Sequence, residues 1–241
     1  MENPYQSPYA NPYTVAAQPV DVRVAFIRKT YGHLAGAIAV FALLETFLMS
    51  IPGIAGTVFG LLGASSYSWL IVLGLFMGVS HFANKWAMSS TSKSTQYAGL
   101  GIYVVIEALI FLPLLLIAQS MAGDNTLIMK AGGVTALLFL ALTFIAFTTK
   151  KDFSFLGGML KIVGFIALGL IVVAVIFPSA ITLGLWFSVA MVIFAAGTIL
   201  YSTSNIIHHY NTNQYVAAAL GLFASVALLF WYVLRIFMNR D

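Results

Sequence analysis

The fold is decided by residues 182–237, TLGLWFSVAMVIFAAGTILYSTSNIIHHYNTNQYVAAALGLFASVALLFWYVLRIF, in which two long apolar runs flank a short polar segment. The runs cover about residues 182–202 and 215–237, and a helix needs about 20 mostly apolar residues to cross a bilayer. An open strand cannot satisfy its backbone polar groups within lipid. The stretch therefore predicts a transmembrane helical hairpin that turns at Asn211–Gln214.

The composition of the chain extends this prediction to all 241 residues. Hydrophobic residues make up 61% of the chain and charged residues only 7%, against about 25% charged residues in a typical soluble domain. The mean hydropathy is +0.98. So few charges exclude an ordinary soluble enzyme, a nucleic-acid-binding protein and a disordered chain. The absence of cysteine excludes a disulfide scaffold, a thiolate metal site and a cysteine nucleophile.

Seven stretches are long and apolar enough to be membrane spans. They lie at about residues 31–50, 68–87, 98–120, 128–148, 157–177, 182–202 and 215–237. The Gly-rich stretch 51–66 is too short to span and predicts a loop or re-entrant segment. Residues 1–22 repeat a Pro-Tyr step, which predicts a disordered tail before a membrane domain at 23–241. The expected fold is an all-α integral membrane protein, a seven-transmembrane-helix bundle in the lipid bilayer.

The positive charges predict the orientation of these spans. If the N-terminus is inside, the inner segments carry eight basic residues: Arg23, Arg28, Lys29, Lys85, Lys93, Lys150, Lys151 and Lys161. The outer segments then carry three: Lys130, Arg235 and Arg240. Lys and Arg concentrate in cytoplasmic loops. We therefore expect a cytoplasmic N-terminus and, with seven spans, an outside C-terminus.

Catalytic chemistry has no recognisable signature in this chain. The sequence contains no His-Glu-x-x-His zinc motif, no Gly-x-Ser-x-Gly nucleophile elbow and no P-loop. His208 and His209 fall in a short polar loop, where solvated side chains are expected in preference to a metal site. We therefore predict no catalytic residue, no cofactor and no metal ligand, and we do not expect an enzyme.

Two acidic residues fall within predicted spans. Glu107 lies about 15 Å along the third span, near the bilayer midplane, and Glu45 lies in the outer part of the first. Intramembrane acids usually face protein or water, because exposure to lipid is costly. Glu107 is therefore either a proton or cation site or a neutral glutamate that hydrogen-bonds to a neighbouring helix.

The last hairpin also predicts a polar contact between its helices. Ser202 and Ser225 are equally far from the turn, so their side chains are expected at the same depth and facing each other. Hydroxyls in lipid more often hydrogen-bond helices together than transport an ion. Gly32 with Gly36, and Gly74 with Gly78, form small-xxx-small pairs that predict close helix packing.

Two motifs resemble the Bax inhibitor-1 family, and most closely its bacterial YccA-like branch. One is Thr148–Leu160, TTKKDFSFLGGML, with Lys150, Lys151, Asp152, Ser154, Phe155 and Leu156. The other is Ser204–His208, SNIIH, with Ser204, Asn205 and His208, followed by the Tyr-Val-Ala-Ala-Ala run. The resemblance runs from about Arg28 to the end of the chain. It implies seven helices with the seventh central, in a bacterial inner (plasma) membrane.

The resemblance implies two alternative functions. YccA-like members are linked to the membrane AAA protease FtsH, whereas other members are calcium-leak proteins gated by an aspartate pair. The positions of that pair are here Ser202 and Ser225, which do not titrate near neutral pH. The favoured hypothesis is a non-enzymatic regulator of FtsH-like quality control. The alternative is a Ca²⁺ or H⁺ leak through the bundle that lacks the aspartate sensor.

Overall fold

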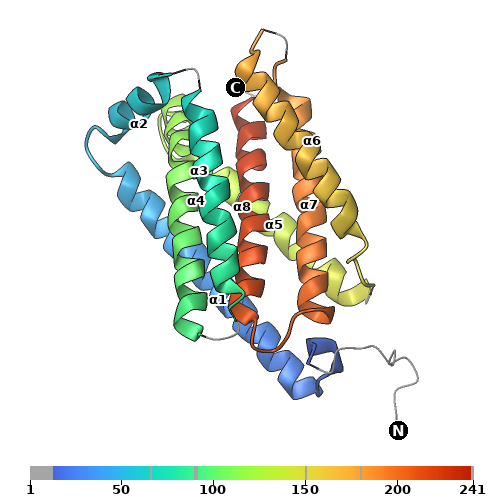
Figure 1. Cartoon of the computed structure of the whole chain (residues 1–241). Coiled ribbons are helices and arrows are strands. Elements are labelled where there is room, and N and C mark those ends of the chain that lie inside the picture. The colour runs from blue at the N-terminus through green and yellow to red at the C-terminus, as the bar shows by residue number, and fades with distance from the viewer. Residues whose placement is uncertain (1–12, 66, 90–91, 150, 180, 240–241) are drawn as a thin grey trace.

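The computed structural model describes residues 13–65, 67–89, 92–149, 151–179 and 181–239. Eight α-helices follow in order within these ranges (Figure 1): α1 (Val20–Met49), α2 (Ile54–Gly63), α3 (Ser68–Ala87), α4 (Lys93–Ala122), α5 (Thr126–Thr149), α6 (Leu156–Ile176), α7 (Leu185–His208) and α8 (Tyr215–Met238). Seven of them, all except α2, are long and apolar enough to cross a membrane. The described part of the chain is therefore all-helical with seven candidate spans, as predicted.

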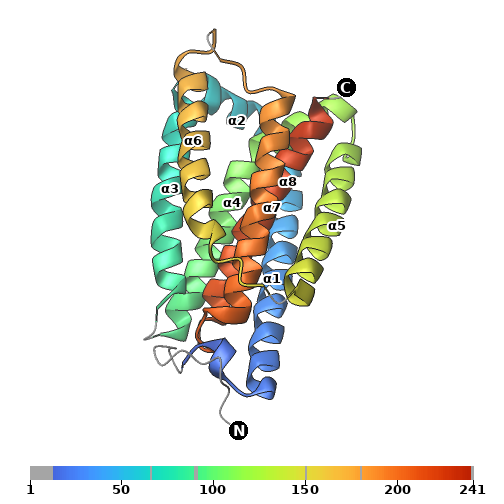
Figure 2. The same ribbon diagram turned by 90° about the vertical axis from the view of Figure 1, so that its right-hand side faces the viewer.

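The most buried of the long helices are α4 and α8. In their most apolar windows 61% and 67% of the residues are buried, against 22% or less in the other long helices. The last span, α8, packs against α1, α3, α4, α5 and α7. Its expected central position stays a prediction. The two views in Figures 1 and 2 show α1 beginning at one end of the bundle and α8 ending at the other. The N-terminal end of α1 and the C-terminal end of α8 therefore lie at opposite ends of the bundle.

Helices α1 and α7 extend beyond the predicted spans. The first helix begins at Val20 and not near residue 31, since its first turns bury Phe26 and Thr30 against the bundle. The helix α7 continues past residue 202 to His208. Its polar last turns stay helical because Thr203, Ser204 and Ile206 are buried. The short helix α2 lies within the predicted loop 51–66 and starts after Gly53, whose φ of 78° favours glycine.

The expected tail is ordered where the structure describes it. Residues 1–12 lie outside the described ranges. Val15 begins a short 3₁₀ helix, Val15–Ala17, and is fully buried. Its backbone N–H donates to the carbonyl oxygen of Tyr210 at 2.8 Å, and Thr14 forms an isolated antiparallel bridge with Asn211. Residues 13–19 therefore pack under the α7–α8 connection in place of forming a free tail.

Close helix packing occurs at different glycines from those predicted. A Cβ atom on Gly32, Gly36, Gly74 or Gly78 would meet nothing within 4 Å, so neither small-xxx-small pair packs against a helix. On Gly99 of α4, by contrast, a Cβ would lie 2.5 Å from the backbone oxygen of Ala83 and 2.6 Å from the backbone nitrogen of Ala87. Gly99 is therefore the glycine that lets the backbones of α3 and α4 approach.

Candidate functional site

The two serines of the last hairpin face each other between α7 and α8. Ser202 Oγ and Ser225 Oγ lie 3.2 Å apart, and the Ser225 hydroxyl also donates to the carbonyl oxygen of Gly221 at 3.0 Å. Because a hydroxyl has one proton, Ser202 is the donor in the contact between the two serines. Ser225 is buried and Ser202 half-buried. This site is a neutral hydrogen-bonded link between two helices.

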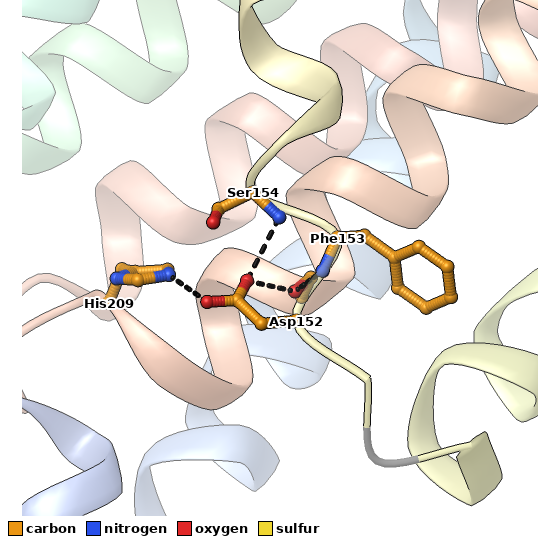
Figure 3. Close-up of polar contacts among 5 residues, drawn as sticks. Asp152, Phe153, Ser154 and His209 are labelled. Atoms are coloured by element: carbon orange, nitrogen blue, oxygen red, sulfur yellow. Dashed lines mark hydrogen bonds and ion pairs between the residues drawn. The ribbon is translucent and has the colours of Figure 1, made fainter.

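A second polar cluster joins the α5–α6 loop to the end of α7 (Figure 3). The Asp152 carboxylate accepts hydrogen bonds from the Ser154 backbone N–H at 2.9 Å and from the Ser204 hydroxyl at 3.1 Å. Its other oxygen lies 2.9 Å from Nε2 of His209. The Ser204 hydroxyl in turn accepts from the backbone N–H of Phe153 at 2.8 Å. Ser204 lies in the last turns of α7 and is 1% exposed. From there its hydroxyl contacts two loop residues, the backbone of Phe153 and the carboxylate of Asp152.

The carboxylate of this cluster is held in its ionised form. Partial burial by itself raises the pKa of Asp152, but the hydrogen bonds from Ser154, His209 and Ser204 outweigh it and lower that pKa to about 2. Asp152 is therefore charged at neutral pH and acts as the acceptor that fixes the loop. His209 lies in the turn after α7 and is exposed, as expected for a solvated loop residue, and it also pairs with Asp152. The expectation is wrong for His208, which is helical and half-buried. His208 is the last residue of α7.

The remaining residues of the two family motifs surround this cluster. Lys151 is exposed, Phe155 is 73% exposed and Leu156 begins α6. The carbonyl oxygen of Asn205 accepts the backbone N–H groups of His209 and Tyr210 at the end of α7. Lys150 lies outside the described residues. The described motif residues therefore lie together where the α5–α6 loop meets the end of α7, which composition alone did not predict because the partners are distant in sequence.

A third polar cluster, not anticipated from the sequence, lies where α1, α4 and α8 begin or meet. The His33 ring accepts or donates a 3.1 Å hydrogen bond with the Tyr97 hydroxyl, which lies 3.4 Å from the Tyr215 hydroxyl. The ammonium group of Lys93 lies 4.3 Å from the Tyr215 ring centroid and donates to the carbonyl oxygen of Asn213 at 2.8 Å. A cation over an aromatic ring is attracted by its quadrupole. These contacts hold the α7–α8 loop against α4.

Glu107 lines a cavity of about 1020 Å³ between α3, α4, α6, α7 and α8. The lining is mostly apolar, with Trp69 and Arg235 toward the end of the bundle where α8 finishes. Tyr103, one turn before Glu107, places its hydroxyl beside the Glu107 carboxyl. The Arg235 guanidinium donates to the carbonyl oxygen of Leu183 at 3.1 Å. Glu107 therefore faces the bundle interior, in a space large enough for water or a ligand.

Glu45 lies apart from this cavity. It is 5% exposed, and neither of its side-chain oxygens has a hydrogen-bond partner in the described residues. Among those residues no group of three or more His, Cys, Asp or Glu side chains is placed to hold a metal ion. The two acids therefore differ in surroundings: Glu107 lines a cavity beside a tyrosine, and Glu45 is enclosed on α1.

The helices define a multi-pass helical membrane protein whose polar residues gather at helix ends. A family model described as an inhibitor of apoptosis-promoting Bax1 matches residues 23–241. The chain therefore belongs to the Bax inhibitor-1 family.

Three relatives show how the similarity is spread. An uncharacterized protein of Pseudomonas aeruginosa is 29% identical over 215 residues, 88% of this chain and 87% of the relative. The modulator of FtsH protease YccA of Escherichia coli is 40% identical over 122 residues, only 50% of this chain and 55% of YccA. Bax inhibitor 1 of Schizosaccharomyces pombe is 27% identical over 239 residues, 98% of this chain and 84% of the relative. The family likeness thus covers the chain, and the likeness to YccA covers half of it.

Proposed function

We propose that this protein is a non-enzymatic, multi-pass regulator in the bacterial inner membrane that modulates quality control by an FtsH-like membrane protease. Family membership supports a regulatory membrane protein, and the relative YccA carries the name of an FtsH modulator. The tally of eight inner and three outer basic residues supports a cytoplasmic N-terminus and an outside C-terminus. The α5–α6 loop then lies on the cytoplasmic side.

The observation that carries this proposal is the neutral contact between Ser202 and Ser225, 3.2 Å apart. Two hydroxyls do not ionise near neutral pH, so the pair neither attracts a cation by charge nor changes with pH. A hairpin without such a sensor favours a constitutive role in binding over gated transport. The hydrogen bond instead ties α7 to α8 and keeps the cytoplasmic ends of these helices in register.

The protease-contacting surface we propose is the α5–α6 loop and the start of α6. Asp152 fixes this loop on α7, so the exposed Lys151 and Phe155 are presented from a rigid base. A large apolar side chain beside a charge on a rigid loop suits protein recognition, since little ordering entropy is lost on binding. Phe155 is 73% exposed and places a large apolar side chain on this surface.

Reconstitution with an FtsH-type protease tests this proposal. The degradation rate of a membrane substrate should fall several-fold when the wild-type protein is present. Phe155→Ala should weaken this effect, whereas Met129→Ala, at an equally exposed residue on α5 near the other end of the bundle, should not. A protease rate that is the same with and without the wild-type protein would contradict the proposed function.

The second candidate function is a proton or cation leak, which the position of Glu107 in its cavity favours. Purified protein in sealed liposomes then passes Ca²⁺ or H⁺ above the level of empty vesicles. Glu107→Gln should abolish that flux while the protein stays folded, and Glu45→Gln, outside the cavity, should leave it unchanged. Flux equal to that of empty vesicles would eliminate this candidate.

A further inference from the structure

A groove of about 1000 Å³ runs along the outside of the bundle between α1 and α4. It is separate from the cavity at Glu107 and from the Asp152 cluster. Three of its lining residues are the glycines Gly32, Gly36 and Gly101, and a Cβ atom on any of them would meet nothing within 4 Å. The groove therefore exists because side chains are missing where the two helices meet, and no part of the described chain fills it.

The groove has one polar end and one apolar end. Asp21, Arg28, Lys29 and His33 line the end near the start of α1. The other end is lined by small and aliphatic side chains from both helices: Ala37, Val40, Leu100 and Val104. Residues four apart lie on one helix face, so Arg28, Gly32, Gly36 and Val40 form a continuous row. This row leads from a cationic group to an apolar slot.

The charges at the polar end suit an anionic group. Arg28 and Lys29 are exposed, and the groove contains one acid, Asp21. Asp21 lies in the first turn of α1, where the helix dipole stabilises a negative charge. His33 closes the floor below the two cations by its 3.1 Å contact with Tyr97 across the α1–α4 junction. Guanidinium and ammonium groups are the usual protein partners of phosphate.

We propose that this groove binds one anionic phospholipid, with the phosphate on Arg28 and Lys29 and an acyl chain in the slot over Gly32, Gly36 and Gly101. Both ends of the groove match such a molecule: cations stand where a headgroup lies, and an unfilled apolar channel lies deeper along the membrane-facing side of α1. Basic pockets between transmembrane helices on the cytoplasmic side recognise anionic headgroups in this way. Binding of a lipid in this groove requires neither the proposed protease regulation nor an ion flux.

Lipid titration of the purified full-length protein tests the proposal. Native mass spectrometry with palmitoyl-oleoyl phosphatidylglycerol as the probe should show one tightly retained lipid and a higher thermal midpoint as lipid is added. A Cβ atom at Gly36 meets nothing within 4 Å. Gly36→Leu should therefore fill the slot while the protein stays folded, and the apparent Kd for the probe should rise at least tenfold. The double variant Arg28→Gln, Lys29→Gln should weaken binding by a similar factor.

Two control variants match these changes outside the groove. Gly78→Leu on α3 adds the same side chain to another glycine with nothing within 4 Å. Lys85→Gln with Lys161→Gln removes the same net charge from two other exposed basic residues. Both controls should bind the probe as the wild type does. The proposal would be overturned if Gly36→Leu bound the probe as tightly as the wild type, or if the controls lost as much affinity as the groove variants. Binding of phosphatidylethanolamine or phosphatidylcholine as tight as that of the probe would also overturn it.

Discussion

At the scale of single residues, Ser204 is the side chain on which the loop cluster depends. Its hydroxyl is used twice, as the acceptor for the Phe153 backbone N–H and as a donor to Asp152. Both contacts cross from α7 to a loop 51 or 52 residues earlier. One small buried hydroxyl thus holds the loop that precedes α6 against α7.

We expect Ser204→Ala to lower the free energy of unfolding by about 1–3 kcal/mol, because it leaves a backbone donor without its partner. Thermal or denaturant unfolding in detergent measures this loss. Thr148→Ala is the matched control, since that exposed hydroxyl bonds only to carbonyl groups of its own helix. A loss no larger than that of the control would show that the Ser204 contacts add no stability.

The Asp152 carboxylate gives the protein a predicted acid sensitivity. Its pKa is lowered to about 2 from a usual value of 3.8. A lowered pKa contributes stability that is present above about 3.8 and is lost as the pH falls from that value through about 2. The thermal midpoint should therefore drop over this window in the wild type. Asp152→Asn should start lower at pH 6 and lose less on acidification, and an unchanged profile in this variant would contradict the prediction.

At the scale of helices, hydropathy predicts which segments are helical better than it predicts their ends. A run of about 20 apolar residues has one stable form in lipid, so all seven long helices follow from the sequence. The start of α1 does not, because Asp21, Arg23 and Arg28 interrupt the apolar pattern there. Its first turns are helical since Phe26 and Thr30 are buried by other elements, which hydropathy does not register.

Local sequence predicts a site only when symmetry or spacing fixes the partner. Ser202 and Ser225 are equidistant from a short turn, and the structure brings their hydroxyls together. The pairing of Asp152 with His209 depends on how a distant loop folds back on α7, so residue spacing gave no signal for it. The same limit applies to glycines: a small-xxx-small pair marks a place where a helix is able to approach, and whether one does is decided by the whole bundle.

Gly99 provides a test of helix approach at this scale. Because a Cβ there would meet backbone atoms of α3, we expect Gly99→Ala to destabilise the protein by about 1–3 kcal/mol through overpacking. Gly133→Ala on α5, where a Cβ meets nothing within 4 Å, should be neutral or stabilise by a few tenths of a kcal/mol. Unfolding of both variants in the same detergent compares them directly. Equal unfolding midpoints for the two variants would mean that α3 and α4 make room for a Cβ at Gly99 without loss of stability.

At the scale of the whole molecule, the orientation in the membrane is open to a direct test. The chain has no cysteine, so single cysteines report sidedness without background labelling. With the N-terminus inside, Lys151→Cys should react with a membrane-impermeant maleimide only from the cytoplasmic side. Asp124→Cys and Asn239→Cys should react only from the outside. Labelling of residue 239 from the cytoplasmic side alone would refute the proposed orientation or the number of spans.

The contact between Val15 and Tyr210 has a consequence for the order of assembly. Residues 13–19 are made before any of the long helices, yet the backbone they bind follows α7. During synthesis the contact cannot form until the first six long helices have been made and Tyr210 has left the ribosome. Docking of Val15 therefore distinguishes a chain that has completed α7 from one whose translation or insertion has stalled earlier.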